Sequence, residues 1–190
     1  MAKPPPAHPG TNHINRPSAC APVRGLVVGR FQPFHNGHLA LIRSAGEQCL
    51  ELTVGIGSAT AKPSLRNPFS FDERKRMVEA ALGAARLQAR VLAIPDLHDP
   101  PRWAAHVAAI VGPVDKVFGN DDETLSLFEL AGVPVVRTGL VERERHEARL
   151  VRAQLAEDDP SWRRAVPPAV AQLLDQWEAG RRLRGMEAMA

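Results

Sequence analysis

Short apolar runs alternate along the chain with segments whose apolar residues recur every three or four positions. The runs cover 26–28, 53–56, 91–94, 116–118 and 133–136, and they read as buried parallel strands. The helical patterns cover about 38–49, 70–82, 101–111, 123–131, 146–156 and 167–184. This alternation predicts an α/β fold: a Rossmann-like, doubly wound parallel sheet of about five strands. Helices cover both faces, and further helices close the chain.

Local signals fix several element ends. Ser70 and Glu73 form a capping box that predicts a helix start, and Pro101 is suited to the first turn of another helix. In an open parallel sheet, ligands bind outside the carboxyl ends of the strands, at the point where the strand order reverses. The loops after Gly29, Gly57 and Ile94, and that after Gly119, are therefore the places to look for chemistry.

The chain divides into a tail and one domain. Residues 1–22 contain six prolines and few bulky apolar side chains, which predicts a disordered tail. Residues 23–185 fit a single domain with its C-terminal helices. No apolar run approaches the roughly 18 residues of a membrane span, and the start lacks a signal-peptide core. Cys20 and Cys49 have no zinc-site spacing. We expect a cytoplasmic protein without a metal site of its own.

Charge is unevenly distributed. The net charge is +3, but the first acidic residue is Glu47, and five Lys or Arg residues and four histidines precede it. A positive N-terminal half favours an anionic partner, either nucleic acid or a nucleotide phosphate. Only 5% of residues are aromatic and none is tyrosine, so a nucleic-acid-binding module ranks low.

The segment from Gly29 to His38, GRFQPFHNGH, follows the first strand and opens a helix. Gly29 allows a sharp turn and close approach of a ligand. His35 and His38 are three residues apart, so a helical first turn places them on one face, with Gly37 between them. A helix N-terminus attracts anions, and Arg30 adds a further cation. The motif itself contains no carboxylate, and it predicts a cradle for a triphosphate.

This segment resembles the HxGH signature of the nucleotidyltransferase superfamily, and its longer form resembles the archaeal-type nicotinamide-mononucleotide adenylyltransferases. The likeness continues at Gly55–Ala59, at Asn67–Phe69 with Glu73 and Arg74, at Gly119–Asn120 and at Val166–Pro167. It covers about residues 24–185. It implies that the phosphate of the mononucleotide attacks the α-phosphorus of ATP and pyrophosphate leaves. Such a nucleophile is already an anion and needs no general base, so catalysis rests on positioning and charge neutralisation.

The resemblance also implies roles for individual residues. His35, His38 and Arg30 would act on the ATP phosphates at the reaction centre. ATP or phosphate binding is implied for the following residues: Gly29, Phe31, Gln32, Gly37, Arg66, Asn120 and Arg152. Mg²⁺ would arrive with ATP. Trp103 would stack on the nicotinamide ring, or it is part of an apolar helix face; Asn120 would contact adenine or ribose, or it is a turn residue.

Two positions depart from the family pattern. The second phosphate motif normally places hydroxyl side chains before its arginine. Here Glu147 and Arg149 stand at those positions, although Arg152 keeps the arginine. An asparagine three residues before the tryptophan is replaced by Pro100, which has no side-chain donor.

Two alternatives follow from these departures. The first is a related nucleotidyltransferase with another phosphorylated acceptor, which would keep both histidines. The second is a non-catalytic nucleotide-binding protein, which would bind ATP without releasing pyrophosphate. The resemblance implies a homo-oligomer, and neither a nucleic acid nor a membrane is expected as a partner.

Overall fold

The structure is a computed structural model, which describes residues 23–97, 99–139 and 148–189. Within these residues a five-stranded sheet has the order β3-β2-β1-β4-β5, and every neighbouring pair is parallel. The strands are β1 (Arg24–Gly29), β2 (Glu51–Ile56), β3 (Arg90–Ala93), β4 (Lys116–Gly119) and β5 (Val135–Arg137). The predicted fold class is confirmed. The segment 1–22 lies outside the described residues, so the boundary of the domain at 23–185 stays a prediction.

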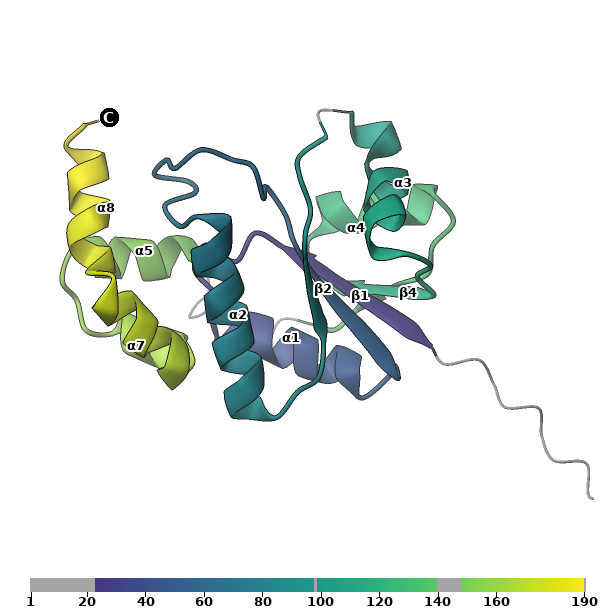
Figure 1. Ribbon diagram of the computed structural model, residues 1–190, viewed down its shortest axis with the longest axis horizontal. Helices are drawn as coiled ribbons and strands as arrows, with labels where there is room; N and C mark the ends of the chain where they lie inside the picture. The colour runs from purple at the N-terminus through teal and green to yellow at the C-terminus, as the bar shows by residue number, and fades with distance from the viewer. Residues whose placement is uncertain (1–22, 98, 140–147, 190) are drawn as a thin grey trace, which may run out of the picture.

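Helices cover both faces of the sheet (Figure 1). On one face, α1 (Asn36–Gly46) and α2 (Phe71–Ala85) pack into a core that also contains the C-terminal helices. On the other face, α3 (Pro100–Val111) and α4 (Asp122–Leu130) pack over β3, β1 and β4 through a second core cluster. The predicted capping box of α2 is present, because Ser70 and Glu73 bond each other's backbone N–H groups.

The strand order reverses between β1 and β4, which is where an open α/β sheet binds its ligand. β1 ends at Gly29 and β4 ends at Gly119, so the GRFQPFHNGH loop and Asn120 emerge side by side. The Gly57 N–H donates to the Gly29 carbonyl oxygen over 2.9 Å, which joins the end of β2 to the same edge.

The C-terminal region differs from the prediction. The pattern over 167–184 indicated one helix, but the structure has α7 (Pro168–Gln176) and α8 (Ala179–Glu187). They are separated at Glu178, whose φ of 49° is left-handed. The preceding Trp177 packs against the main core and beneath the Arg76 guanidinium, which lies 5.2 Å from its ring centroid. The chain turns beside this half-buried ring, where sequence propensity alone would continue the helix.

The remaining helices are α5 (Ala148–Ala156) and the short α6 (Trp162–Ala165), which the sequence pattern did not predict. In Figure 1, α5, α7 and α8 lie together beyond α2, and contacts join α2 to α7 and α5 to α8.

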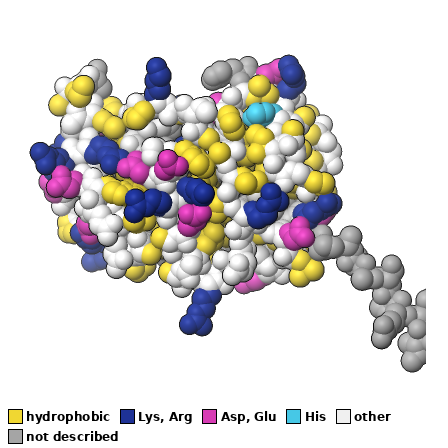
Figure 2. All heavy atoms as spheres, viewed as in Figure 1, with side chains coloured by type: hydrophobic (Ala, Val, Ile, Leu, Met, Phe, Trp, Pro, Cys, Tyr) yellow, Lys and Arg dark blue, Asp and Glu magenta, His cyan; other side chains and the backbone are white. Residues whose placement is uncertain are grey.

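Charged side chains on the surface are mixed in sign. On the face in Figure 2, cationic side chains are interspersed with acidic ones. Near the C-terminus, Arg184 pairs with Asp158 at 2.7 Å, and Arg181 pairs with Glu178 at 3.1 Å. These arginines therefore have carboxylate partners. No helix in the described part of the chain has the length and apolar character that a bilayer crossing requires.

Candidate functional site

The two motif histidines form the N-terminal cap of α1. His35 is the N-cap residue, and its Nδ1 accepts from the His38 backbone N–H at 3.4 Å. In return, the Nδ1 of His38 accepts from the His35 N–H at 3.2 Å. This is a capping box in which imidazoles replace the usual hydroxyl and carboxylate side chains. Because the Nδ1 of each ring accepts, the proton of each neutral ring is on Nε2.

The two rings are stacked, and apolar side chains surround them. The ring centroids of His35 and His38 are 3.5 Å apart, and the Phe31 ring meets His38 edge-on at 4.8 Å. The pKa of His38 is well below its ordinary value, because the partly buried ring is desolvated and the adjacent His35 opposes a second charge. His38 is therefore neutral at neutral pH, and its Nε2 carries a proton that it can donate to a ligand. A phosphate placed beside this pair would favour the protonated ring.

The loop between β1 and α1 is held from three sides. The Gln32 side chain is 3% exposed, and it both donates to and accepts from the Phe69 backbone, at 2.9 and 3.0 Å. The Arg152 Nη1 donates to the Gln32 carbonyl oxygen over 2.6 Å. Phe31 is buried at a φ of 52°, and its ring lies directly against Gly29. Gly37, between the histidines, is the second residue of α1.

Two arginines from distant segments approach Arg30 at the start of this loop. Arg30 follows β1, Arg66 is at the exposed tip of a tight turn between Ser64 and Asn67, and Arg152 is in α5. The pKa of Arg30 is lowered by partial desolvation and then by the Arg66 charge. Burial also lowers the pKa of Arg152, and the charges of Arg30, Arg149 and Arg66 add to this effect. Mutual repulsion among these cations favours a bound polyanion.

Carboxylates reach the same region from neighbouring loops. Asp96 after β3 and Asp121 after β4 both raise the pKa of Arg30. Asp96 also accepts a hydrogen bond from the Ser58 hydroxyl at 3.0 Å. The motif itself lacks acidic residues, but the assembled site does not. Among the described residues, no group of three His, Cys, Asp or Glu side chains is placed to hold a metal ion.

Two predicted ligand residues make protein contacts. The Asn120 amide donates to Thr138 Oγ1 at 3.1 Å and so ties the loop after β4 to the end of β5. Trp103 is half-buried in α3, and its ring meets Phe128 edge-on at 5.5 Å. Part of the indole remains exposed, so packing and ligand stacking are compatible. Of the second phosphate motif, His146 and Glu147 lie outside the described residues, and Arg149 is exposed on α5.

Sequence reasoning did not single out Arg74 as a site residue. Arg74 is 1% exposed, and its guanidinium donates to backbone carbonyls of the loops after β1 and β2. A sequence signal was present: Arg74 is three residues before Met77 and four before Val78, on the face of α2 that carries the core positions.

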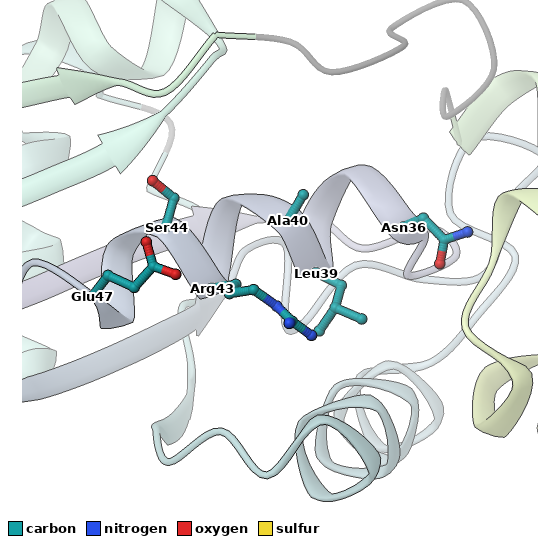
Figure 3. A pocket seen from close by; sticks show the side chains of 6 residues that line it. All are labelled: Asn36, Leu39, Ala40, Arg43, Ser44 and Glu47. Carbon is teal, nitrogen blue, oxygen red and sulfur yellow. The ribbon is translucent and has the colours of Figure 1, made fainter.

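A shallow hollow lies on the outer face of α1 (Figure 3). It is lined by Asn36, Leu39, Ala40, Arg43, Ser44 and Glu47, at helical spacing. None of the predicted site residues lines it, so the candidate site remains the strand edge described above.

A sequence profile of the cytidylyltransferase-like family matches residues 26–135, which span β1 to the start of β5 and include the histidine motif. The chain thus belongs to the cytidylyltransferase-like family of nucleotidyltransferases. Two curated relatives are both called nicotinamide-nucleotide adenylyltransferase. That of Methanocorpusculum labreanum is 36% identical over 87% of this chain and 95% of its own length, and that of Haloarcula marismortui is 33% identical over 85% and 86%. The chain belongs to the family of nicotinamide-nucleotide adenylyltransferases.

The fold is shared with a solved bifunctional protein. The crystal structure of an NMN adenylyltransferase/ADP ribose pyrophosphatase from Francisella tularensis, complexed with AMP and a manganese ion, superposes with a TM-score of 0.72 at 21% identity. The match covers 88% of this chain but 52% of that longer chain. At this identity the likeness establishes the fold.

Proposed function

We propose that this protein transfers the adenylyl group of ATP to nicotinamide mononucleotide, forming NAD and pyrophosphate. The observation that carries the proposal is the cationic cradle at the strand switch point. Stacked His35 and His38 and the mutually repelling Arg30, Arg66 and Arg152 surround the end of β1. Family membership supplies the class of reaction, and the cradle supplies the groups which that reaction needs.

In the proposed reaction, a phosphate oxygen of nicotinamide mononucleotide attacks the α-phosphorus of ATP. A new P–O bond forms, the bond to the bridging oxygen breaks, and pyrophosphate leaves with that electron pair. The nucleophile is already anionic, so no side chain has to remove a proton. The Nε2–H of His38 would donate a hydrogen bond to the phosphate oxygens on which charge builds, and the Arg30 guanidinium would neutralise that charge. Mg²⁺ enters as part of the MgATP substrate.

Trp103 would receive the nicotinamide ring, because an indole face attracts a cationic pyridinium. The indole is only partly buried in α3, so part of it can meet a ligand, which supports this role. Pro100 stands where the related pattern has an asparagine, so a backbone group or another side chain has to bind the carboxamide. A cytoplasmic location and a homo-oligomeric state belong to the same proposal; fractionation and light scattering test them.

An acceptor panel tests the function. Purified protein with MgATP receives nicotinamide mononucleotide, nicotinic acid mononucleotide or pantetheine phosphate in turn, and dinucleotide product and pyrophosphate are quantified. We expect equal amounts of NAD and pyrophosphate with the nicotinamide acceptor. A faster reaction with another acceptor would reassign the substrate. MgATP binding without pyrophosphate release, whichever acceptor is supplied, would favour a non-catalytic protein.

A further inference from the structure

Arg74 is a buried cation at the back of the candidate site. It lies in the first turn of α2, and among the described residues it is the only buried arginine. No carboxylate in the described parts of the chain is within salt-bridge distance of it. A buried charge without an ionic partner is costly, so its retention calls for a compensating interaction.

The compensation comes from backbone carbonyls. Arg74 Nη1 donates to the Arg30 carbonyl oxygen at 2.8 Å and to the Gly57 carbonyl oxygen at 2.6 Å. Nη2 donates to the Ser58 carbonyl oxygen at 2.9 Å, and Nε to that of Ser70 at 3.2 Å. A planar guanidinium with five donors can make such a set, whereas a lysine ammonium has three donors on a single atom.

These carbonyls belong to three separate segments. Arg30 begins the loop after β1, Gly57 and Ser58 begin the loop after β2, and Ser70 caps α2. The sheet ladder ends at Gly29 and Ile56, so it no longer aligns the two loops beyond those residues. Arg74 replaces the missing ladder bonds by joining both loops to one rigid helix.

The electrostatic surroundings agree with this geometry. Burial lowers the pKa of Arg74, Asp96 raises it, and Arg30 lowers it. Arg74 and Arg30 therefore repel each other as cations while the Arg74 side chain holds the Arg30 backbone. This arrangement fixes the Arg30 main chain and leaves its guanidinium directed by other charges, such as those of a triphosphate.

We propose that Arg74 is a positioning residue of the phosphate cradle: by binding the carbonyls of Arg30, Gly57 and Ser58, it sets where the loops after β1 and β2 meet ATP. It acts through the loops and does not itself touch the substrate. The effect on turnover rests on the proposed function, whereas the effect on MgATP binding does not.

The test compares Arg74→Lys and Arg74→Gln with Arg24→Lys. Arg24 is at the opposite end of β1, where its guanidinium pairs with Asp115 at 2.8 Å, away from the cradle. For each protein we would measure thermal unfolding, the Kd for MgATP by calorimetry, and kcat and KM for NAD formation. Lysine keeps the charge of Arg74 but cannot reach the same set of carbonyls.

We expect both Arg74 variants to lower kcat about ten- to a hundredfold, because a displacement near 1 Å costs that much in a positioned reaction. In both Arg74 variants the Kd for MgATP should rise, and the KM for nicotinamide mononucleotide should stay within twofold of the wild-type value. The control Arg24→Lys should lower the melting temperature and keep the wild-type kcat. Wild-type kcat and Kd in a folded Arg74 variant would overturn the proposal. So would unfolding of both variants at the assay temperature, since Arg74 would then serve stability alone. Absence of NAD from wild type would refute the function, and the MgATP comparison would still decide the role of Arg74.

Discussion

Gly29→Ala places a methyl group at the most crowded point of the cradle. A Cβ at residue 29 would lie 2.9 and 3.0 Å from two carbons of the Phe31 ring, closer than van der Waals contact allows. The ring cannot easily give way: Phe31 is 1% exposed and is held at a φ of 52°. The same ring also meets His38 edge-on, at a centroid distance of 4.8 Å. Overpacking of this kind costs about 1–3 kcal/mol of the free energy of unfolding.

The same substitution at Gly83 is the matched control. Gly83 is in α2, and a Cβ there meets no atom within 4 Å. Alanine in a helix interior is favoured over glycine by about 0.5–1 kcal/mol. For a chain of this size, 1 kcal/mol shifts the melting temperature by about 2–4 °C. Gly83→Ala should therefore melt slightly higher than wild type, and Gly29→Ala several degrees lower.

Differential scanning calorimetry measures both shifts in melting temperature. The rate of NAD formation, measured below the unfolding transition, reports whether the cradle still supports turnover. We expect Gly29→Ala to lose turnover beyond its loss of folded protein, because the Phe31 ring moves against His38. If Gly29→Ala melts with wild type and keeps full activity, the loop tolerates the methyl group. The close packing of Phe31 against residue 29 and His38, as described above, would then be refuted.

Further predictions concern charge and stacking. Because the pKa of His38 is lower in the folded than in the unfolded protein, stability is lost as pH falls below the unfolded value of about 6.5, and His38→Gln should reduce this loss in urea titrations. MgATP binding should raise that pKa, and calorimetry in buffers of different ionisation enthalpy should detect proton uptake in wild type only. Arg182→Met removes a pairing with Glu73 at 2.7 Å; we expect a lower melting temperature and a higher KM for ATP, since Glu73 caps the helix bearing Arg74. Trp103→Leu should raise the KM for nicotinamide mononucleotide and leave the KM for ATP unchanged. A KM for the mononucleotide equal to that of wild type would assign Trp103 to the core.

The sheet and the motif were predictable because each depends on neighbouring residues. The apolar runs encode buried strands, and the spacing of His35 and His38 encodes the first turn of α1. The pattern did not reveal contacts between residues that are far apart in the sequence. Gln32 looked like a ligand residue, but its amide is occupied by Phe69, 37 residues later. Asn120 is engaged in the same way by Thr138.

Arg74 and Glu178 illustrate two other limits. A buried arginine contradicts the usual exposure of charged residues, and the carbonyls that accept its hydrogen bonds become visible only when three segments meet. Glu178 adopts a left-handed conformation that its residue type does not favour, so the break between α7 and α8 follows from tertiary packing.

The most direct test of the account follows the α-phosphate. ATP radiolabelled at the α-position is mixed with nicotinamide mononucleotide and Mg²⁺, and the products are separated for wild type and for His38→Ala. We expect wild type to move the label into NAD while unlabelled pyrophosphate is released, and His38→Ala to bind ATP but lose most of this transfer. Label that stays in ATP with wild-type protein, or transfer at the wild-type rate by His38→Ala, would contradict the central claim.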